Sequence, residues 1–152
     1  MPDNENAAAS ALLSEIAEEE RLLDALYREA ARRFGLPDCA MWVLYFLAIS
    51  EEPVTQQGLC GLMMYPKQTI NSSVAKLVDR GLVELAGIPG ARNSKSVALT
   101  AEGRKLADAT VLRMRAAEER ALASLGDEGM RSFVGLYRRF REAVQSEMAN
   151  EA

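Results

Sequence analysis

Polar side chains that could pair with bases and phosphates lie along one side of a short segment of the chain. Gln68 and Asn71 each offer a donor and an acceptor, which is the pattern that pairs with an adenine edge, and Ser72 can hydrogen-bond to several bases. Lys67 and Lys76 add the positive charge that attracts phosphates. The chemistry that these residue types support is recognition of double-stranded DNA.

A second basic and polar group follows in a loop rich in Gly, Pro, Asn and Ser. Two short β-prone runs, residues 82–86 and 96–99, flank this loop and predict a hairpin. Arg92, Asn93 and Lys95 lie at or near the expected tip. We expect this tip to contact phosphates or a narrowed minor groove.

Enzymatic chemistry finds little support in the sequence. The chain has no histidine, so it lacks the commonest general base and the commonest nitrogen ligand for zinc. Cys39 and Cys60 lack paired metal-ligand spacing, and no phosphate-binding glycine loop or nucleophile elbow occurs. The acidic run at residues 18–20 is typical of a solvated helix face. We predict that the chain is not an enzyme and uses no cofactor or metal.

The elements that must position the DNA-pairing residues begin with a short helix. The residues that recur there at helical spacing are Val54, Leu59, Leu62 and Met63. Thr55 is placed to cap the start of this helix by accepting a hydrogen bond from a backbone N–H. Met64 and Tyr65 are expected to form the turn that follows.

The DNA-pairing residues themselves lie on a second predicted helix. Pro66 suits its first position, because its missing N–H would have had no partner, and Gly81 suits a left-handed end. The apolar stripe expected to face a core is Ile70, Val74, Leu77 and Val78. The order of helix, turn, helix and hairpin is typical of a winged helix-turn-helix lobe, which we assign to residues 38–100.

Long helices are predicted on both sides of this lobe. An amphipathic helix over residues 11–34 ends at Gly35, and an apolar helix over residues 38–50 should be buried. Thr100 is placed to cap one long helix and Asp127 to cap a last one. The apolar stripe of the last helix is Met130, Phe133, Tyr137, Phe140, Val144 and Met148. Packing rather than propensity stabilises most helices, so these helices need partners.

The chain resembles the MarR family of bacterial transcription regulators over roughly residues 12–148. The resemblance rests on LPDCAMWVLYFL, on TQQGLCGLMMYPKQTINSSVAKLVDRGLVEL and on VALTAEGRKL, and its most specific part is GLVE followed after a wing-sized gap by V-x-LT-x-x-G. It implies a mainly α (α+β) fold and an obligate homodimer on a palindromic operator. Residues 11–34 and 101–148 would be dimerisation helices within a single domain, residues 1–152.

Some positions depart from the family pattern. Many members carry Asp-x-Arg in the wing, where the Asp holds an Arg that enters the minor groove, but Ala91 and Asn93 stand at those positions. Arg92 lies between them and could substitute. Ser72 occupies a position that is often Arg in the family. These departures keep an alternative open, a dimeric protein-interaction module that has lost specific DNA binding.

Charge is distributed unevenly along the chain. The net charge is −4, yet residues 66–95 hold five bases and two acids, whereas residues 1–35 hold eight acids and four bases. A local charge of +3 suits attraction to phosphate. No apolar run approaches the roughly 20 residues that span a bilayer, and the N-terminus lacks the basic start of a signal peptide. We predict a cytoplasmic protein with no membrane partner.

The resemblance also implies an effector site between the dimerisation helices and the lobe. Its expected lining is Trp42, Tyr45, Met63 and Tyr65, with Met41 and Met64 nearby. These residues suit a small aromatic or amphipathic effector that releases a repressor from DNA. The alternative is that they form core, since Met fills irregular gaps. A thiol switch at Cys39 is a further alternative, although Asp38 beside it would oppose ionisation.

Overall fold

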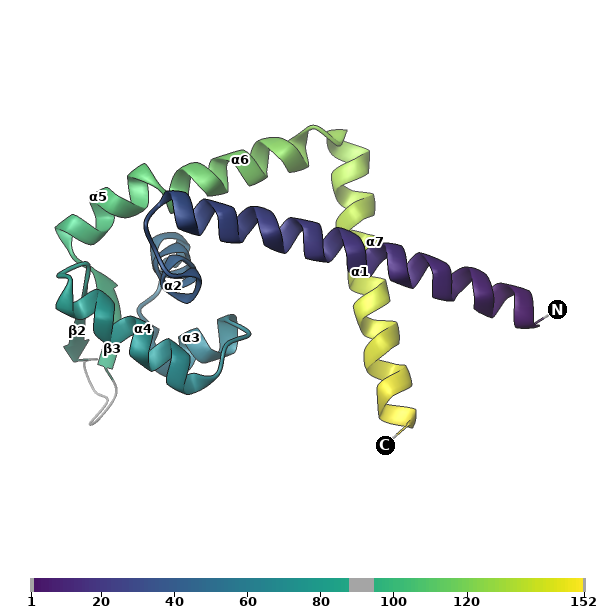
Figure 1. The fold of residues 1–152 in the computed structure, drawn as a ribbon, viewed down its shortest axis with the longest axis horizontal. Coiled ribbons are helices and arrows are strands. Elements are labelled where there is room, and N and C mark those ends of the chain that lie inside the picture. Colours follow the sequence, from purple (N-terminus) through teal and green to yellow (C-terminus); the bar gives the residue numbers. More distant parts are fainter. Residues whose placement is uncertain (1, 88–94, 152) are drawn as a thin grey trace. The chain divides into compact units, whose positions relative to one another are not determined.

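The computed structural model describes residues 2–87 and 95–151, and its internal contacts divide the chain into two units, Met1–Leu112 and Arg113–Ala152 (Figure 1). The helices are α1 (Pro2–Arg33), α2 (Asp38–Ile49), α3 (Gln56–Leu62), α4 (Lys67–Asp79), α5 (Ala101–Ala109), α6 (Val111–Ala123) and α7 (Gly126–Asn150). The strands are β1 (Val54–Thr55), β2 (Val83–Gly87) and β3 (Lys95–Leu99). The predicted mainly α (α+β) winged-helix fold is confirmed. No described helix has the length and apolar character needed to cross a membrane.

The core of the first unit is built around α2. Met41, Val43 and Leu44 of this helix are fully buried, as its nearly continuous apolar sequence predicts. The helix packs against α1, α4 and α5, and Figure 1 shows it between α1 and α4. It ends at Ile49, one residue earlier than expected, and Ser50 forms the C-cap. Helix α4, which carries the DNA-pairing residues, therefore packs against a buried apolar helix.

The helix-turn-helix is formed by α3 and α4. The Thr55 hydroxyl accepts a hydrogen bond from the Gly58 N–H at 2.9 Å, which confirms the predicted cap. Pro66 is the N-cap of α4 rather than its first residue, because its extended ψ of 139° turns its carbonyl toward the N–H of Thr69 at 2.9 Å. At the other end Gly81 takes a φ of +67°, as predicted, a conformation that glycine adopts at no steric cost.

The sheet has the order β1-β3-β2, with antiparallel pairing throughout. The predicted hairpin is confirmed, with its first strand one residue later and its second strand beginning one residue earlier than expected, so that Val83 pairs with Leu99 and Gly87 with Lys95. Strand β1 was not predicted, because Val54 was assigned to the helical stripe. Two β-branched residues, Val54 and Thr55, favour an extended segment just before the cap, and Val54 pairs with Val97.

The flanking helices differ from the prediction in their ends. Helix α1 begins at Pro2 instead of residue 11, because proline suits a first helical position and the three alanines at residues 7–9 favour the helix. The single helix expected after Thr100 is two helices, because at Thr110 the backbone leaves the helical region with φ −128° and ψ −88°. The Thr110 hydroxyl donates to the Leu106 carbonyl at 2.5 Å, a contact of the kind that bends helices.

The second unit contains the last helix, α7. Its N-cap is Leu125, so the prediction that Asp127 caps it is wrong. Asp127 lies instead in the first turn, where its charge is favourable beside the positive end of the helix dipole. The assignment of a single domain with dimerisation helices at both ends stays a prediction.

Candidate functional site

Helix α4 presents the predicted DNA-pairing residues on its outer side. Its inner side is formed by Ile70, Val74 and Leu77, which are buried, while Val78 of the predicted stripe is half-buried. The predicted residues that are exposed on the outer side are Lys67, Gln68, Ser72 and Lys76. These four side chains are accessible to a nucleic acid.

Asn71 differs from this group. It is half-buried, and its Oδ1 atom is buried with no hydrogen-bond partner among the described residues. The sequence pattern placed Asn71 on the exposed side, but it follows Ile70 directly and lies at the border of the buried face. An unpaired buried amide oxygen costs about 1–3 kcal/mol, so a donor brought within its reach would stabilise this side chain.

The hairpin contributes one described residue of the predicted DNA surface. Lys95 is exposed at the start of β3, opposite Gly87. Arg92 and Asn93, together with Ala91, lie outside the described residues. Glu84 of β2 is also exposed, so the described strands carry one basic and one acidic exposed side chain.

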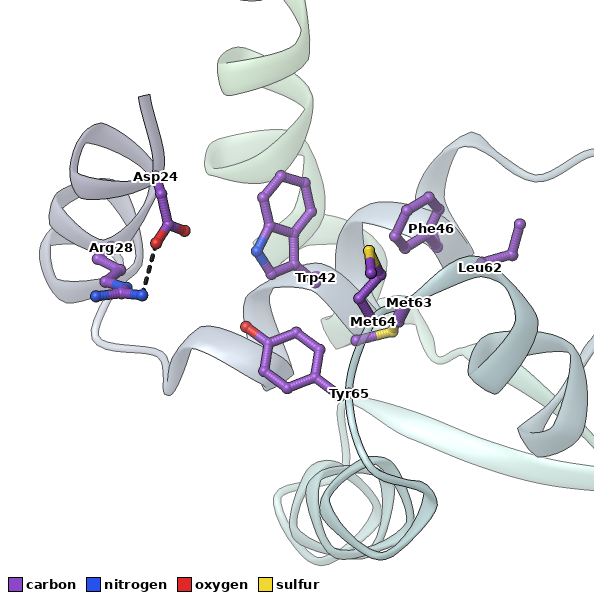
Figure 2. Close-up of a pocket in the computed structure, with 8 residues that line it drawn as sticks. All are labelled: Asp24, Arg28, Trp42, Phe46, Leu62, Met63, Met64 and Tyr65. Carbon is purple, nitrogen blue, oxygen red and sulfur yellow. Dashed lines mark ion pairs between the residues drawn. The ribbon is translucent and has the colours of Figure 1, made fainter. Parts of the chain in front are cut away.

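A pocket of about 450 Å³ lies between α1, α2 and the turn that joins α3 to α4 (Figure 2). Its lining residues are Asp24, Arg28, Trp42, Phe46, Leu62, Met63, Met64 and Tyr65. Three of the four predicted effector residues, Trp42, Met63 and Tyr65, therefore lie around one cavity. The fourth, Tyr45, is buried and does not line it, but its ring packs against Trp42 with centroids 5.3 Å apart.

Three residues of the lining were not predicted from the sequence: Asp24, Arg28 and Phe46. The Asp24 carboxylate and the Arg28 guanidinium form an ion pair at 2.5 Å, four residues apart on α1. That spacing predicts an ion pair. It does not reveal where α1 passes α2, and this crossing is what brings the pair opposite the aromatic rings. Figure 2 shows the pair on one side and Trp42 and Phe46 beyond it.

Tyr65 connects the pocket to the start of α2. Its hydroxyl donates a hydrogen bond to Asp38 Oδ2, while Asp38 Oδ1 is buried without a partner among the described residues. Burial raises the pKa of Tyr65 well above its usual value, and the Asp38 carboxylate raises it further. The hydroxyl therefore stays protonated as a donor, and it holds the turn that leads directly into α4.

Replacing Tyr65 by phenylalanine is expected to reduce the free energy of unfolding by about 1–3 kcal/mol, because the part-buried Asp38 carboxylate loses its donor. Urea denaturation followed by circular dichroism measures the change. Asp38→Ala and the double variant complete a double-mutant cycle. Additive effects of the two single substitutions would mean that this hydrogen bond contributes nothing to stability.

Cys39 has the surroundings of a structural residue. Burial raises the pKa of the Cys39 thiol, a hydrogen bond with Ser73 opposes that shift, and the Asp38 charge adds to it. A thiol held protonated in this way is a poor nucleophile, so its surroundings give no support to a thiol switch at Cys39. Across the described residues, no group of three or more His, Cys, Asp or Glu could hold a metal ion.

Comparison with known proteins finds similarity to transcription regulators. A family model described as the MarR family matches residues 34–92. An HTH-type transcriptional regulator of Bacillus subtilis (strain 168), YwoH, is 29% identical over 129 residues, which cover 85% of this chain and 93% of YwoH. YwoH itself is uncharacterised.

Two solved structures share the fold. NMB1585, a MarR family regulator from Neisseria meningitidis, superposes with a TM-score of 0.77 at 20% identity, over 93% of this chain and 99% of that one. A putative MarR family regulator from Listeria monocytogenes, solved with a 26mer DNA, has a TM-score of 0.70 at 15% identity, over 89% of each chain.

Proposed function

We propose that the chain acts as a DNA-binding transcription regulator of the MarR family, which binds an inverted-repeat operator as a homodimer and represses transcription until a small molecule releases it. The observation that carries the proposal is the outer side of α4. Exposed Lys67, Gln68, Ser72 and Lys76 lie there, on a helix whose inner side is fixed to α2.

The residues of α4 have distinct roles in this proposal. Gln68 and Ser72 contact base edges in the major groove, and Asn71 pairs its unsatisfied amide oxygen with the amino group of an adenine. Lys67 and Lys76 contact phosphates, as does Lys95 from β3. Arg92 and Asn93 of the wing are proposed to reach the backbone or the minor groove.

The homodimer is supported by apolar faces that the single chain leaves uncovered. On α7 no described residue is buried, and Phe133, Leu136 and Tyr137 are each more than half exposed. On α1, Leu12, Leu13 and Leu26 are also more than half exposed. Apolar surfaces of this extent mark interaction sites, and a second copy of the chain is the occupant that we propose.

The operator geometry follows from a two-fold axis. Two copies of α4 presented on one side of a dimer contact successive major grooves about 34 Å apart, one turn of the DNA helix. The half-sites are then inverted repeats spaced by about one helical turn. In a dimer this arrangement also doubles the local positive charge of residues 66–95.

Release by an effector is supported by the position of the pocket. Tyr65 lines the cavity and stands directly before Pro66, the N-cap of α4. A ligand that displaces the Tyr65 ring moves the residue that sets where α4 begins. An effector can change the DNA affinity only if it binds more tightly to one of these two positions of Tyr65 than to the other.

The test is an anisotropy titration of the purified protein against DNA flanking its own gene, with random duplex as competitor, at two salt concentrations. The proposal expects tight, salt-sensitive and sequence-selective binding by a dimer. Binding without selectivity across a broad set of sites would instead favour a dimeric protein-interaction module that has lost specific DNA contact.

Substitutions on α4 should separate base contacts from phosphate contacts. Asn71→Ala or Gln68→Ala is expected to cost about 1–3 kcal/mol on the specific site and to relax base preference. Lys76→Ala should weaken binding to all sequences and reduce the salt slope by about one. Lys105→Ala on α5, which removes an exposed lysine away from α4, is the matched control. Equal losses on specific and random DNA for Asn71→Ala and Gln68→Ala would refute their base-reading roles.

A further inference from the structure

The pocket between α1, α2 and the α3–α4 turn has aromatic walls. Trp42, Phe46 and Tyr65 line it, and the Trp42 ring lies 6.2 Å from Phe46 between centroids (Figure 2). Aromatic faces attract cations through their quadrupole, with tryptophan the strongest of the three. Met63 and Met64 complete the lining with polarisable thioethers, which adapt to the shape of bulky ligands.

The charged groups around this pocket favour a cation over an anion. Arg28 is the single base among the described lining residues, and it is already paired with Asp24 at 2.5 Å. The Tyr65 hydroxyl is likewise engaged, since it donates to Asp38. Two carboxylates therefore act on the cavity against one guanidinium. An anionic ligand would have to break the ion pair, whereas a cation is attracted by the excess of one carboxylate in this group.

We propose that this pocket binds a lipophilic organic cation, such as a quaternary ammonium or phosphonium with aromatic substituents. The inference deepens the effector site of the proposed function and rests on that proposal. The volume of the pocket, about 450 Å³, lies within the roughly 300–1,000 Å³ typical of small-molecule sites. A cation whose charge is delocalised or shielded by its substituents is favoured by the aromatic lining, because it loses little hydration when it enters an apolar cavity.

Trp42 makes the proposal directly measurable, because it is the only tryptophan of the chain. The probes are tetraphenylphosphonium and tetraphenylborate, which match in size and apolar surface but carry opposite charges. We expect tetraphenylphosphonium to quench Trp42 fluorescence and to bind about tenfold or more tightly than tetraphenylborate. Calorimetry on the same samples separates binding from optical artefacts.

Asp24→Asn tests the origin of the preference. This isosteric change removes one carboxylate and frees Arg28, so the charge preference should fall by about tenfold or reverse. Glu19→Gln, an equivalent loss of charge at an exposed position of α1 outside the pocket lining, is the control and should leave the preference unchanged.

The outcomes distinguish the ligand class from the proposed function. Tighter binding of tetraphenylborate than of tetraphenylphosphonium would overturn the cation proposal while leaving an effector site in place. An Asp24→Asn variant with the preference of the intact protein would also overturn it. Binding of tetraphenylphosphonium at Trp42 with no change in operator affinity would support the ligand class and refute release by this site.

Discussion

Replacing Gly103 by alanine is expected to lower the free energy of unfolding by about 3 kcal/mol, near the upper end of what overpacking costs. Gly103 lies in the first turn of α5, where a Cβ atom would stand 1.8 Å from the carbonyl oxygen of Leu82 and 2.8 Å from its carbonyl carbon. These are backbone atoms that no rotamer change can move. The Leu82 oxygen also accepts a hydrogen bond from the Thr100 N–H at 3.1 Å, so the helix and the hairpin would have to separate.

The measurement is urea denaturation followed by the helical circular dichroism signal, at fixed protein concentration. The matched control is Gly61→Ala in α3, where an added Cβ meets nothing within 4 Å. This control is expected to stabilise the protein by about 0.5–1 kcal/mol, because alanine is the better helix former. Similar unfolding midpoints for the two variants would show that Gly103 does not lie against the Leu82 backbone.

The need for glycine at position 103 could not be explained from the sequence. The motif V-x-LT-x-x-G supported the resemblance as a pattern of letters, and Thr100 could be assigned as a cap from its type and place. The cap is confirmed, with the Thr100 hydroxyl 3.0 Å from the Gly103 N–H. The reason for glycine is a contact with Leu82, a residue far earlier in the chain, and such contacts have no local signature.

Features of the fold that depend on nearby residues were predicted, whereas features that depend on distant residues were not. Helix α4, the Thr55 cap and the left-handed Gly81 were predictable because each depends on residues within one or two turns. Strand β1 was missed because two residues carry no period, and its pairing partner Val97 lies in the hairpin. The break at Thr110 was missed because the apolar stripe continues through it.

The candidate site was predictable in part for similar reasons. The outer residues of α4 follow from helical spacing, whereas the half-burial of Asn71 depends on what packs beside α4. Trp42, Met63 and Tyr65 could be proposed for a pocket from their types. Asp24 lines the pocket because α1 passes α2 at that point, and no local pattern in the sequence predicts this crossing.

Placing two glutamates on the apolar face of α7 is expected to abolish the dimer at micromolar concentration. Leu136 is 62% and Phe140 42% exposed in the single chain, and they lie four residues apart on one face. A dimer would bury four such side chains, each worth about 1.5–3 kcal/mol, so Leu136→Glu/Phe140→Glu should raise its dissociation constant by about four orders of magnitude or more. Glutamate is a good helix former, so α7 itself should persist.

Sedimentation equilibrium gives the oligomeric state of this variant, and anisotropy with operator DNA gives the functional consequence. A monomer presents one α4 and can occupy one half-site. Its affinity for the proposed operator should therefore be lower than that of the dimer by at least the binding free energy that the second half-site contributes. The control Arg138→Gln/Gln145→Glu makes the same change in net charge on the polar side of α7 and should remain dimeric. A variant that stays dimeric with intact helical signal would place the interface elsewhere than on α7, and a monomer that keeps full affinity would remove the need for two-fold binding.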